Sequence, residues 1–285
     1  MVQKILADCW QCGFGAYTLL GGEPLCYPGI ATVLRTAYNL GYHQTVCTNG
    51  GRIREYHKEL SQDLNTLLIS IDAIGEKHDQ LRRHPGLFRK ILEGIDSLKK
   101  ENTRCNMVIW STLSRVNQNL VMDLCKLARE LKIFIEFFPA NSYWGCKPDL
   151  ILSDSERSET FTQVIELKRK GYPITNTTRS LELIKGALPF RCNISGVSIY
   201  MLWDGAVYPC DPRAVGAETM LGRAPQLEFK NLAASPRFQK YAKELRSCNN
   251  CYCAAVVHHA DNIWAAGTRR FLNNAYYHHI YSMVR

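Results

Sequence analysis

Long apolar runs are the first feature that this sequence lacks. No stretch of about 18 consecutive apolar residues occurs, so no transmembrane helix is predicted. The N-terminus has no apolar core followed by a small-residue cleavage site, which argues against a secretory signal peptide. No internal repeat or low-complexity tract is present. What remains is a globular composition, 46% apolar and 21% charged over 285 residues, enough for one large α/β domain and a small appended one.

The net charge of +9 is not gathered into a nucleic-acid signature. The densest basic groups are short, and none is interleaved with aromatic residues. They are Arg82-Arg83-His84, Lys99-Lys100 and Arg269-Arg270. We therefore expect a solvated surface with a mild preference for anionic ligands and no nucleic-acid partner.

Cysteine is abundant, at 12 residues, but its spacing is not that of a secreted disulfide framework, which is short and dense throughout. Five cysteines stand singly on apolar or helical stretches: Cys26, Cys47, Cys105, Cys125 and Cys146. Five others gather in the last third: Cys192, Cys210, Cys248, Cys251 and Cys253. This pattern predicts a protein of the reducing cytoplasm with a metal or cluster site.

Apolar runs alternate with amphipathic stretches along the first half of the chain, which predicts a parallel sheet with helical crossovers. The expected strands are 16–20, 45–48, 67–71, 106–110 and 134–138. The expected helices are 28–41, 87–99, 119–132, 154–170 and 179–186. Pro28 lies just inside the start of its helix and Gly41 just past its end, and Ser153 is the expected cap of a later one.

The stretch Gly21-Gly22-Glu23-Pro24-Leu25 directly follows the first expected strand. Ligands of α/β sheets bind at the carboxyl ends of the strands, where this turn would lie. The two glycines let a ligand approach the backbone, Glu23 offers an acceptor for a cationic group, and Pro24 fixes the exit of the loop. An ordinary strand-to-helix turn with a solvated Glu23 is the alternative.

The late cysteines frame a predicted β-hairpin. Asp204-Gly205 is a strong two-residue turn between the apolar runs 197–203 and 206–209. Pairing outward from that turn sets Cys210 near Ile199, toward the open end of the hairpin.

A four-thiolate site follows from the same hairpin. Cys192 precedes it, Cys210 ends it, and Cys248 with Cys251 adds a C-x2-C pair. Four thiolates suit either an iron–sulfur cluster or zinc. Zinc ribbons usually use two C-x2-C pairs, and only one is present here. Cys253 is a spare or substitute ligand.

Together these stretches resemble the radical S-adenosylmethionine (radical SAM) superfamily. The motifs that carry the resemblance are LLGGEPL (19–25), TVCTNG (45–50), LLISIDAIGEKHDQLRRHPGLF (67–88), FIEFFPA (134–140) and CNISGVSIYMLWDGAVYPCD (192–211). The last is similar to the start of the auxiliary-cluster domain known as SPASM or its shorter twitch form. The resemblance implies an α/β fold: a partial (β/α) TIM-like barrel with parallel strands at 1–140, a connecting helical segment at 141–190, a small cysteine-rich cluster domain at 191–255 and a tail at 256–285.

The resemblance also implies a reaction. S-adenosylmethionine would be cleaved reductively to a 5′-deoxyadenosyl radical, which abstracts hydrogen from a peptide or small molecule. It implies an auxiliary 4Fe–4S cluster, favours iron–sulfur over zinc at the cysteines, and calls for an electron donor such as flavodoxin or ferredoxin. The cofactor-binding residues carried over from the family pattern are Gly21, Gly22, Glu23, Pro24, Asn49, Ser70 and Asp72.

Some polar positions have simpler interpretations as well. Asp72 shares a strand face with Ser70, and a helix cap explains it equally well. Glu136 would point into the barrel and then need a partner. His78 and His84 lie in a charged stretch and are expected to be exposed to solvent.

One family feature is incomplete. Three cysteines spaced C-x3-C-x2-C after the family's first strand hold the cluster that cleaves S-adenosylmethionine. Only Cys9 and Cys12 lie upstream of Gly21, with Ile5 at the position of the third. Too few residues separate Cys12 from the strand at 16–20 for a parallel crossover, and helical spacing makes Cys9 a buried core thiol. We therefore expect the chain to begin inside the first crossover helix, without the first strand. The alternative function is a truncated or non-catalytic barrel that keeps a cofactor pocket and a structural four-cysteine zinc or iron–sulfur site.

Overall fold

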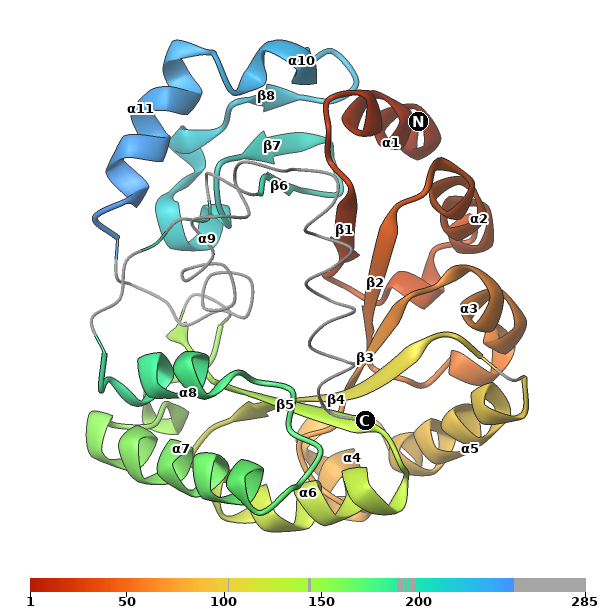
Figure 1. Ribbon diagram of the computed structural model, residues 1–285, viewed down its shortest axis with the longest axis vertical. Helices are drawn as coiled ribbons and strands as arrows, with labels where there is room; N and C mark the ends of the chain where they lie inside the picture. The colour runs from red at the N-terminus through yellow and green to blue at the C-terminus, as the bar shows by residue number, and fades with distance from the viewer. Residues whose placement is uncertain (102, 143–144, 189–191, 193, 195–197, 249–285) are drawn as a thin grey trace.

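The computed structural model describes residues 1–101, 103–142, 145–188, 192, 194 and 198–248. These residues form one five-stranded sheet and one small three-stranded sheet. Figure 1 shows the large sheet curving along one side of the molecule, with helices on its outer surface and the small sheet beyond its first strand.

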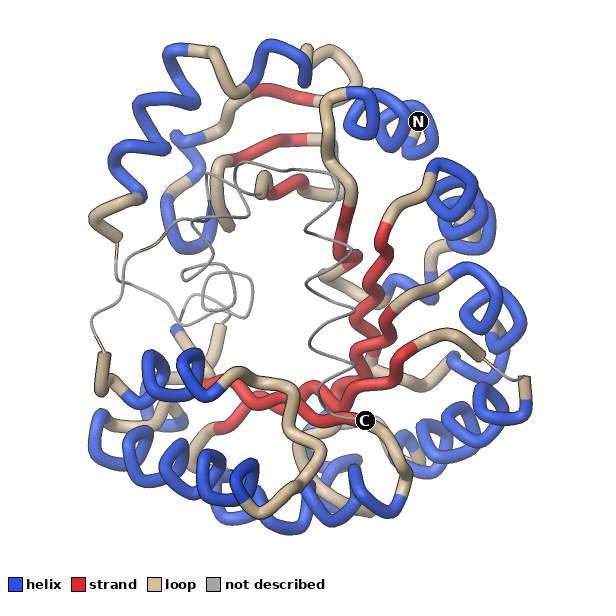
Figure 2. Tube along the Cα trace, viewed as in Figure 1, coloured by secondary structure: helices blue, strands red, loops and turns tan. Residues whose placement is uncertain are grey.

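The strands of the large sheet follow one another in sequence and in space, in the order β1-β2-β3-β4-β5. They are β1 (Ala16–Leu19), β2 (His43–Thr48), β3 (Thr66–Ser70), β4 (Asn106–Leu113) and β5 (Phe134–Pro139). All their pairings are parallel. Figure 2 shows them as one curved wall with the helices outside, which confirms the predicted partial barrel.

Helices lie before, between and after the strands. They are α1 (Val2–Gln11), α2 (Ile30–Leu40), α3 (His57–Asp63), α4 (Glu76–Arg82), α5 (Leu87–Lys100), α6 (Val121–Glu130), α7 (Asp154–Arg169) and α8 (Thr178–Lys185). α2 begins after Gly29, so Pro28 lies outside it and not inside as predicted. Gly41 ends α2 with a left-handed φ of 87°, and Ser153 caps α7 in a capping box with Glu156, both as predicted.

The two faces of the large sheet have different surroundings. Ile69 and Ile109 are paired in register and fully buried in the main core between sheet and helices. Ser70, Trp110 and Glu136 form the next row along the strands. Because successive strand residues point to opposite faces, this row lies on the inner side of the curved sheet, which we call the lumen.

One edge of this sheet, at β5, is covered by a segment that runs alongside it. The Ile135 N–H donates to the Pro173 carbonyl at 2.9 Å, and the Thr175 N–H donates to the Ile135 carbonyl at 2.9 Å. The Asn176 side chain accepts from the Phe137 N–H at 2.9 Å and donates to the Phe137 carbonyl at 3.0 Å. The backbone groups of β5 that point outward at these positions are therefore satisfied.

The C-terminal part of the described chain is small and antiparallel. Its elements are β6 (Tyr200–Met201), β7 (Ala206–Tyr208), α9 (Pro212–Val215), β8 (Gly222–Arg223), α10 (Phe229–Leu232) and α11 (Pro236–Leu245). β7 lies between β6 and β8. Ile5 of α1 packs in one apolar cluster with Val207 and Phe229, so α1 joins this part to the barrel.

The β6–β7 hairpin is shifted by one residue from the predicted register. The observed pairing, extended along the hairpin, sets Cys210 opposite Ser198 and not Ile199. The cause is the loop, which has three residues (203–205) between the paired ends and not two. Gly205 takes a left-handed φ of 82°, the usual last residue of a three-residue hairpin loop.

Candidate functional site

The loop after β1 exposes bare backbone at the carboxyl end of the sheet. Gly21 and Gly22 have φ values of 81° and 52°, a region that favours glycine, and both are exposed. A Cβ added at either would meet no atom within 4 Å. The chain then enters the 3-10 helix η1 (Pro24–Cys26), with Glu23 as its cap and Pro24 buried. Among the described residues, the space beside these two glycines is therefore open.

The Glu23 carboxylate is engaged by the chain itself. The Thr48 hydroxyl donates to Glu23 Oε1 at 2.6 Å, and the Asn49 N–H donates to Oε2 at 2.7 Å. The Leu25 N–H donates to Oε1 at 3.1 Å. Glu23 thus ties the loop after β1 to the end of β2, and the interpretation of Glu23 as a merely solvated turn residue is wrong. Its role as an acceptor for a ligand's ammonium group stays a prediction.

A second tie joins the same two loops. The Arg52 Nη1 donates to the Leu25 carbonyl at 2.7 Å, and its Nε donates to Glu55 Oε2 at 2.8 Å. Asn49 lies between these ties, and its side-chain oxygen accepts from the Gly51 N–H at 2.8 Å. The turn after β2 is therefore held against the loop after β1 from both sides.

Ser70 and Cys47 meet in the lumen at the ends of β3 and β2. Cys47 Sγ lies 3.9 Å from Ser70 Oγ. Burial raises the pKa of the Cys47 thiol to about 11, against smaller lowering effects of Ser70 and the Arg82 charge. The thiol is thus protonated at neutral pH, and Arg82 lies close enough to act on it.

Asp72 cross-links three elements at the same end of the sheet. Its Oδ1 accepts from the Thr112 N–H of β4 at 3.0 Å, and its Oδ2 lies 2.6 Å from Arg82 Nη2 of α4. The helix-cap interpretation is wrong, because α4 is preceded by Gly75 and has no side-chain cap. Arg82 Nε is buried without a hydrogen-bond partner, so this guanidinium keeps donors to spare.

His78 is fully buried, contrary to the prediction that it is exposed, whereas His84 is exposed as expected. The His78 Nδ1 accepts from the Asp72 N–H at 3.3 Å, and the His78 ring centroid lies 5.9 Å from that of Phe88. Burial lowers the pKa of His78, so the imidazole is neutral at physiological pH and supports the backbone of Asp72.

Asn117 is a site residue that the sequence analysis missed. It is 1% exposed, and its side-chain amide donates to the carbonyls of Asp72 and Thr112, each at 3.0 Å. Its oxygen accepts from the Ser114 N–H at 2.8 Å. In sequence it is one polar residue of a polar turn, so no local pattern distinguishes it.

Replacing Asn117 by alanine should lower the free energy of unfolding by about 1–3 kcal/mol, because buried partners lose their hydrogen bonds. Urea titration followed by circular dichroism measures this. Asn119→Ala, at an exposed position two residues away, is the matched control and should stay within about 0.5 kcal/mol. Equal effects of the two substitutions would contradict the assigned role of Asn117.

Cys9 and Cys12 do not fit as ligands of a cluster. Cys9 is within α1, and Cys12 is the residue that ends it. Both pack against the apolar cluster that α1 shares with the C-terminal part. Burial raises the pKa of Cys9 to about 12 and raises that of Cys12. The predicted helix is confirmed, but Cys9 is only partly buried and not fully buried as predicted.

The structure brings three of the late cysteines together. Cys192, Cys210 and Cys248 belong to one small cluster with Ile194 and Leu245. Within the described residues, no group of three or more His, Cys, Asp or Glu side chains already has the arrangement of a metal site. The two remaining predicted ligands lie outside the described residues: Cys251 and Cys253.

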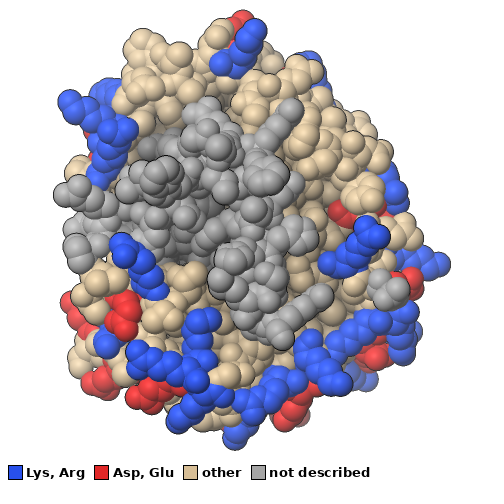
Figure 3. All heavy atoms as spheres, viewed as in Figure 1, with Lys and Arg blue, Asp and Glu red and all other residues tan. Residues whose placement is uncertain are grey.

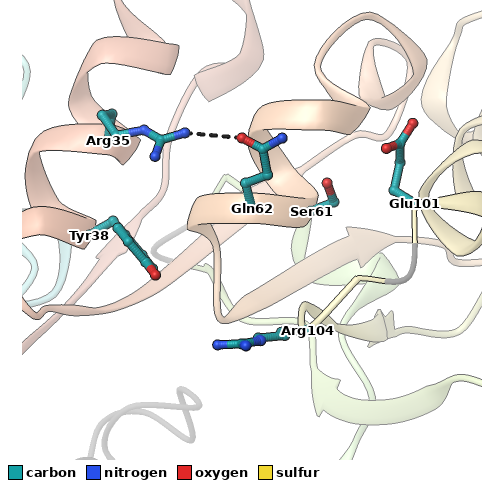
Figure 4. A pocket seen from close by; sticks show the side chains of 6 residues that line it. All are labelled: Arg35, Tyr38, Ser61, Gln62, Glu101 and Arg104. Carbon is teal, nitrogen blue, oxygen red and sulfur yellow. Dashed lines mark hydrogen bonds between the residues drawn. The ribbon is translucent and has the colours of Figure 1, made fainter.

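A hollow of about 380 Å³ lies at the opposite end of the sheet. It is lined by polar side chains of α2, α3 and the segment that leads into β4, including Arg35, Gln62 and Arg104 (Figure 4). Arg35 Nη2 donates to Gln62 Oε1 at 3.0 Å. Because Arg104 precedes β4, this hollow is separate from the loops at the carboxyl ends.

The charged surface shows no concentration at one place on the face seen in Figure 3, where basic side chains along the outer helices have acidic ones among them. In the part of the chain that is described, no helix is both long enough and apolar enough to cross a membrane.

Comparison with known proteins gives two family matches. Residues 2–132 match the Radical SAM superfamily, and residues 192–252 match the iron–sulfur cluster-binding domain SPASM. GTP 3′,8-cyclase of Clostridium perfringens (strain 13 / Type A) is 25% identical over 190 residues, which cover 64% of this chain and 55% of the cyclase. The chain thus spans about half the length of this curated relative.

Solved structures agree on the fold. The structure of anSMEcpe with bound AdoMet has a TM-score of 0.66 and 16% identity, and the match covers 99% of this chain and 85% of that one. Streptococcus suis SuiB bound to precursor peptide SuiA has a TM-score of 0.68 and 15% identity, covering 89% and 62%. The two family matches imply S-adenosylmethionine and iron–sulfur clusters as cofactors.

Proposed function

Because the chain belongs to the radical SAM superfamily and carries a SPASM domain, we propose that the carboxyl ends of β1–β3 bind S-adenosylmethionine. The C-terminal domain would hold an auxiliary 4Fe–4S cluster. The observation that carries the first part is the joining of the loops after β1 and β2 by Glu23, which sets exposed backbone beside Asn49.

The donors and acceptors at this end suit the cofactor. The carbonyls of Gly21 and Gly22 are acceptors for its ammonium group, and the Ser70 hydroxyl is a partner for its ribose. Arg82, held by Asp72, has spare donors for its carboxylate. Glu23 and Asp72 would act by holding this frame, since their carboxylates already bond to the chain.

The late cysteines suit the auxiliary cluster. One small group of packed side chains already contains Cys192, Cys210 and Cys248. Cys251 would complete a set of four thiolates through its C-x2-C spacing to Cys248. Cys253 is the substitute ligand. The domain boundaries at 140, 190 and 255 stay part of this proposal.

The reaction class is proposed from family membership alone. It is hydrogen abstraction from a peptide or a small molecule by a 5′-deoxyadenosyl radical, with flavodoxin or ferredoxin as electron donor. One relative is named as a cyclase of GTP and one structural neighbour is bound to a precursor peptide, so both substrate classes stay open. We assign no step of the cleavage to Cys9 or Cys12, whose thiols face an apolar cluster.

A second function is favoured by that same observation. A non-catalytic barrel that binds the cofactor and keeps a structural four-cysteine zinc or iron–sulfur site needs no further thiolates. Metal analysis after anaerobic purification tests this second function. Stoichiometric zinc without iron would favour the non-catalytic barrel with a structural metal site.

Isothermal titration of the purified chain with S-adenosylmethionine tests the cofactor site. We expect weak but measurable binding, and Glu23→Ala should weaken it at least about tenfold, or 1.4 kcal/mol, because the two loops separate. Glu76→Ala, at an exposed position on α4, is the control and should bind as the wild type does. Unchanged affinity in Glu23→Ala, or no binding by the wild type, would contradict the proposal.

A further inference from the structure

The hollow at the end of the sheet opposite the cofactor loops is built around a fixed guanidinium. Arg35 extends from α2, and its Nε lies 3.0 Å from Oδ2 of Asp63, the last residue of α3. The Arg35 Nη2 donates to Gln62 Oε1 at 3.0 Å (Figure 4). These two contacts with α3 hold the plane of the guanidinium, although the Arg35 side chain is 51% exposed. No described residue accepts a hydrogen bond from Arg35 Nη1, so the donors of this nitrogen are available to a ligand.

The carboxylate of Asp63 occupies an unfavourable place in order to hold this guanidinium. Asp63 is 2% exposed, and burial raises the pKa of its carboxyl group against a smaller lowering effect of the Arg35 charge. Asp63 also ends α3, where the helix dipole disfavours a negative charge. A buried carboxylate destabilises a fold unless a cation compensates it closely, and Arg35 is that cation. The result is an arginine whose direction is fixed before any ligand arrives, which is what a binding site requires.

A second guanidinium lies at the same hollow. Arg104 precedes β4, is exposed, and has no hydrogen bond or ion pair to a described residue. Figure 4 shows Arg104 lying across the hollow from Arg35. Two cations around one small hollow repel each other, and an anion between them would remove that repulsion. Glu101 is the one acidic residue of the described lining, and its Oε1 lies 2.9 Å from His57 Nδ1.

The size and the aromatic lining of the hollow indicate a small molecule with a ring. The volume of about 380 Å³ is within the range of small-molecule sites, roughly 300–1,000 Å³. Tyr38 of α2 lines the hollow and is 49% exposed, and the Arg35 guanidinium lies 5.9 Å from the centroid of the Tyr38 ring. An exposed ring beside a guanidinium is a surface on which an aromatic base can stack.

We propose that this hollow binds a nucleoside monophosphate, with the phosphate between Arg35 and Arg104 and the base on the Tyr38 ring. The planar fork of a guanidinium matches the oxygen geometry of phosphate, and two guanidinium groups match its double negative charge. The site lies at the opposite end of the sheet from the loops after β1, β2 and β3, so its ligand would not compete with S-adenosylmethionine. The inference is independent of the proposed function, since it uses neither the cofactor loops nor the late cysteines.

Isothermal titration of the full chain with AMP tests the site. The wild type should bind AMP, and Arg104→Ala should weaken that binding at least about tenfold, because charge-assisted hydrogen bonds to the phosphate are lost. Arg104 has no described partner, so this variant should melt as the wild type does. Arg89→Ala is the matched control, because it removes the same charge from an exposed position at the far end of α5. Equal affinities of the Arg104→Ala and Arg89→Ala variants would overturn the inference.

Two further ligands test the parts of the proposed nucleotide. Adenosine lacks the phosphate and should bind at least about tenfold more weakly than AMP, because the charge-assisted hydrogen bonds are absent. Ribose 5-phosphate lacks the base and should also bind more weakly than AMP. Adenosine binding as tightly as AMP would overturn the phosphate contact with the two arginines. Ribose 5-phosphate binding as tightly as AMP would overturn stacking of the base on Tyr38.

A titration in the presence of S-adenosylmethionine separates this site from the cofactor site, because AMP and the cofactor both contain adenosine. At saturating S-adenosylmethionine, AMP should bind the wild type with unchanged affinity. Displacement of AMP by the cofactor, or no AMP binding by the wild type, would overturn the inference. Failure of S-adenosylmethionine itself to bind would count against the proposed function and not against the AMP site.

Discussion

Reconstituted protein of residues 1–285, given S-adenosylmethionine and a strong reductant without air, is expected to form no 5′-deoxyadenosine above background. Reductive cleavage in this family needs a cluster on three cysteines spaced C-x3-C-x2-C, and the 285 residues contain no such spacing. Cys9 lies in α1 and Cys12 ends it, and both pack against an apolar cluster, so we do not expect these two thiols to replace the three cysteines. Chromatography of quenched reactions, with mass detection, measures the product.

Cys9→Ala and Cys12→Ala serve as controls for this expectation. If the two thiols take no part, both variants should match the wild-type baseline. Robust 5′-deoxyadenosine production by the chain alone would contradict the claim that Cys9 and Cys12 take no part in cofactor cleavage. A loss of that product in Cys9→Ala would then identify the thiol responsible.

The second large effect concerns the late cysteines. Alanine at Cys192, Cys210, Cys248 or Cys251 should each abolish the visible absorption of the auxiliary cluster and reduce iron from about four per chain to near zero. Each substitution removes one thiolate ligand of the iron–sulfur cluster, and no described neighbour replaces it. Without the iron–sulfur cluster, the apolar side chains packed around Leu245 are less well held. The visible absorption spectrum and the iron and sulfide content, taken after anaerobic reconstitution, measure the two losses.

Two matched substitutions sharpen this test. Cys26→Ala changes an exposed cysteine far from the cluster in sequence and should leave the iron content unchanged. Cys253→Ala should have a smaller effect than Cys251→Ala. The reverse order would show that the ligand assignment within 248–253 is wrong, and two full clusters in the wild type would contradict the account of Cys9 and Cys12.

Much of the fold was predictable because buried parallel strands are continuous apolar runs. Segments such as Leu67–Ile71 and Phe134–Phe138 have no competing pattern, so the five strands and their parallel arrangement follow from the alternation with helices. The helix ends with strong local signals, Ser153 and Gly41, were also predictable. Pro28 was not, since proline is tolerated both at a helix start and just before it.

The hairpin register shows a limit of local patterns. Asp204-Gly205 is compatible with a two-residue loop and with the last two positions of a three-residue loop. The choice depends on cross-strand contacts, such as the pairing of Tyr200 with Tyr208, which the sequence does not state. The difference of one residue changes which residue faces Cys210.

The site was predictable as a set of strand ends but not as a network. Glu23 and Asp72 could be placed at the correct edge, yet their partners lie 25 and 40 residues away, at Thr48 and Thr112. Asn117 and buried His78 were missed for the same reason. Contacts between distant segments decide burial and hydrogen bonding, and no spacing rule within one segment reports them.

Amide hydrogen exchange with and without S-adenosylmethionine tests the central claim most directly, because it locates the cofactor on the chain. The account predicts slower exchange in the loops after β1, β2 and β3, namely at Gly21–Leu25, Asn49–Gly51 and Asp72. It predicts no change around Arg104, at the other end of the sheet. Protection confined to the Arg104 end, or none anywhere at saturating cofactor, would contradict it.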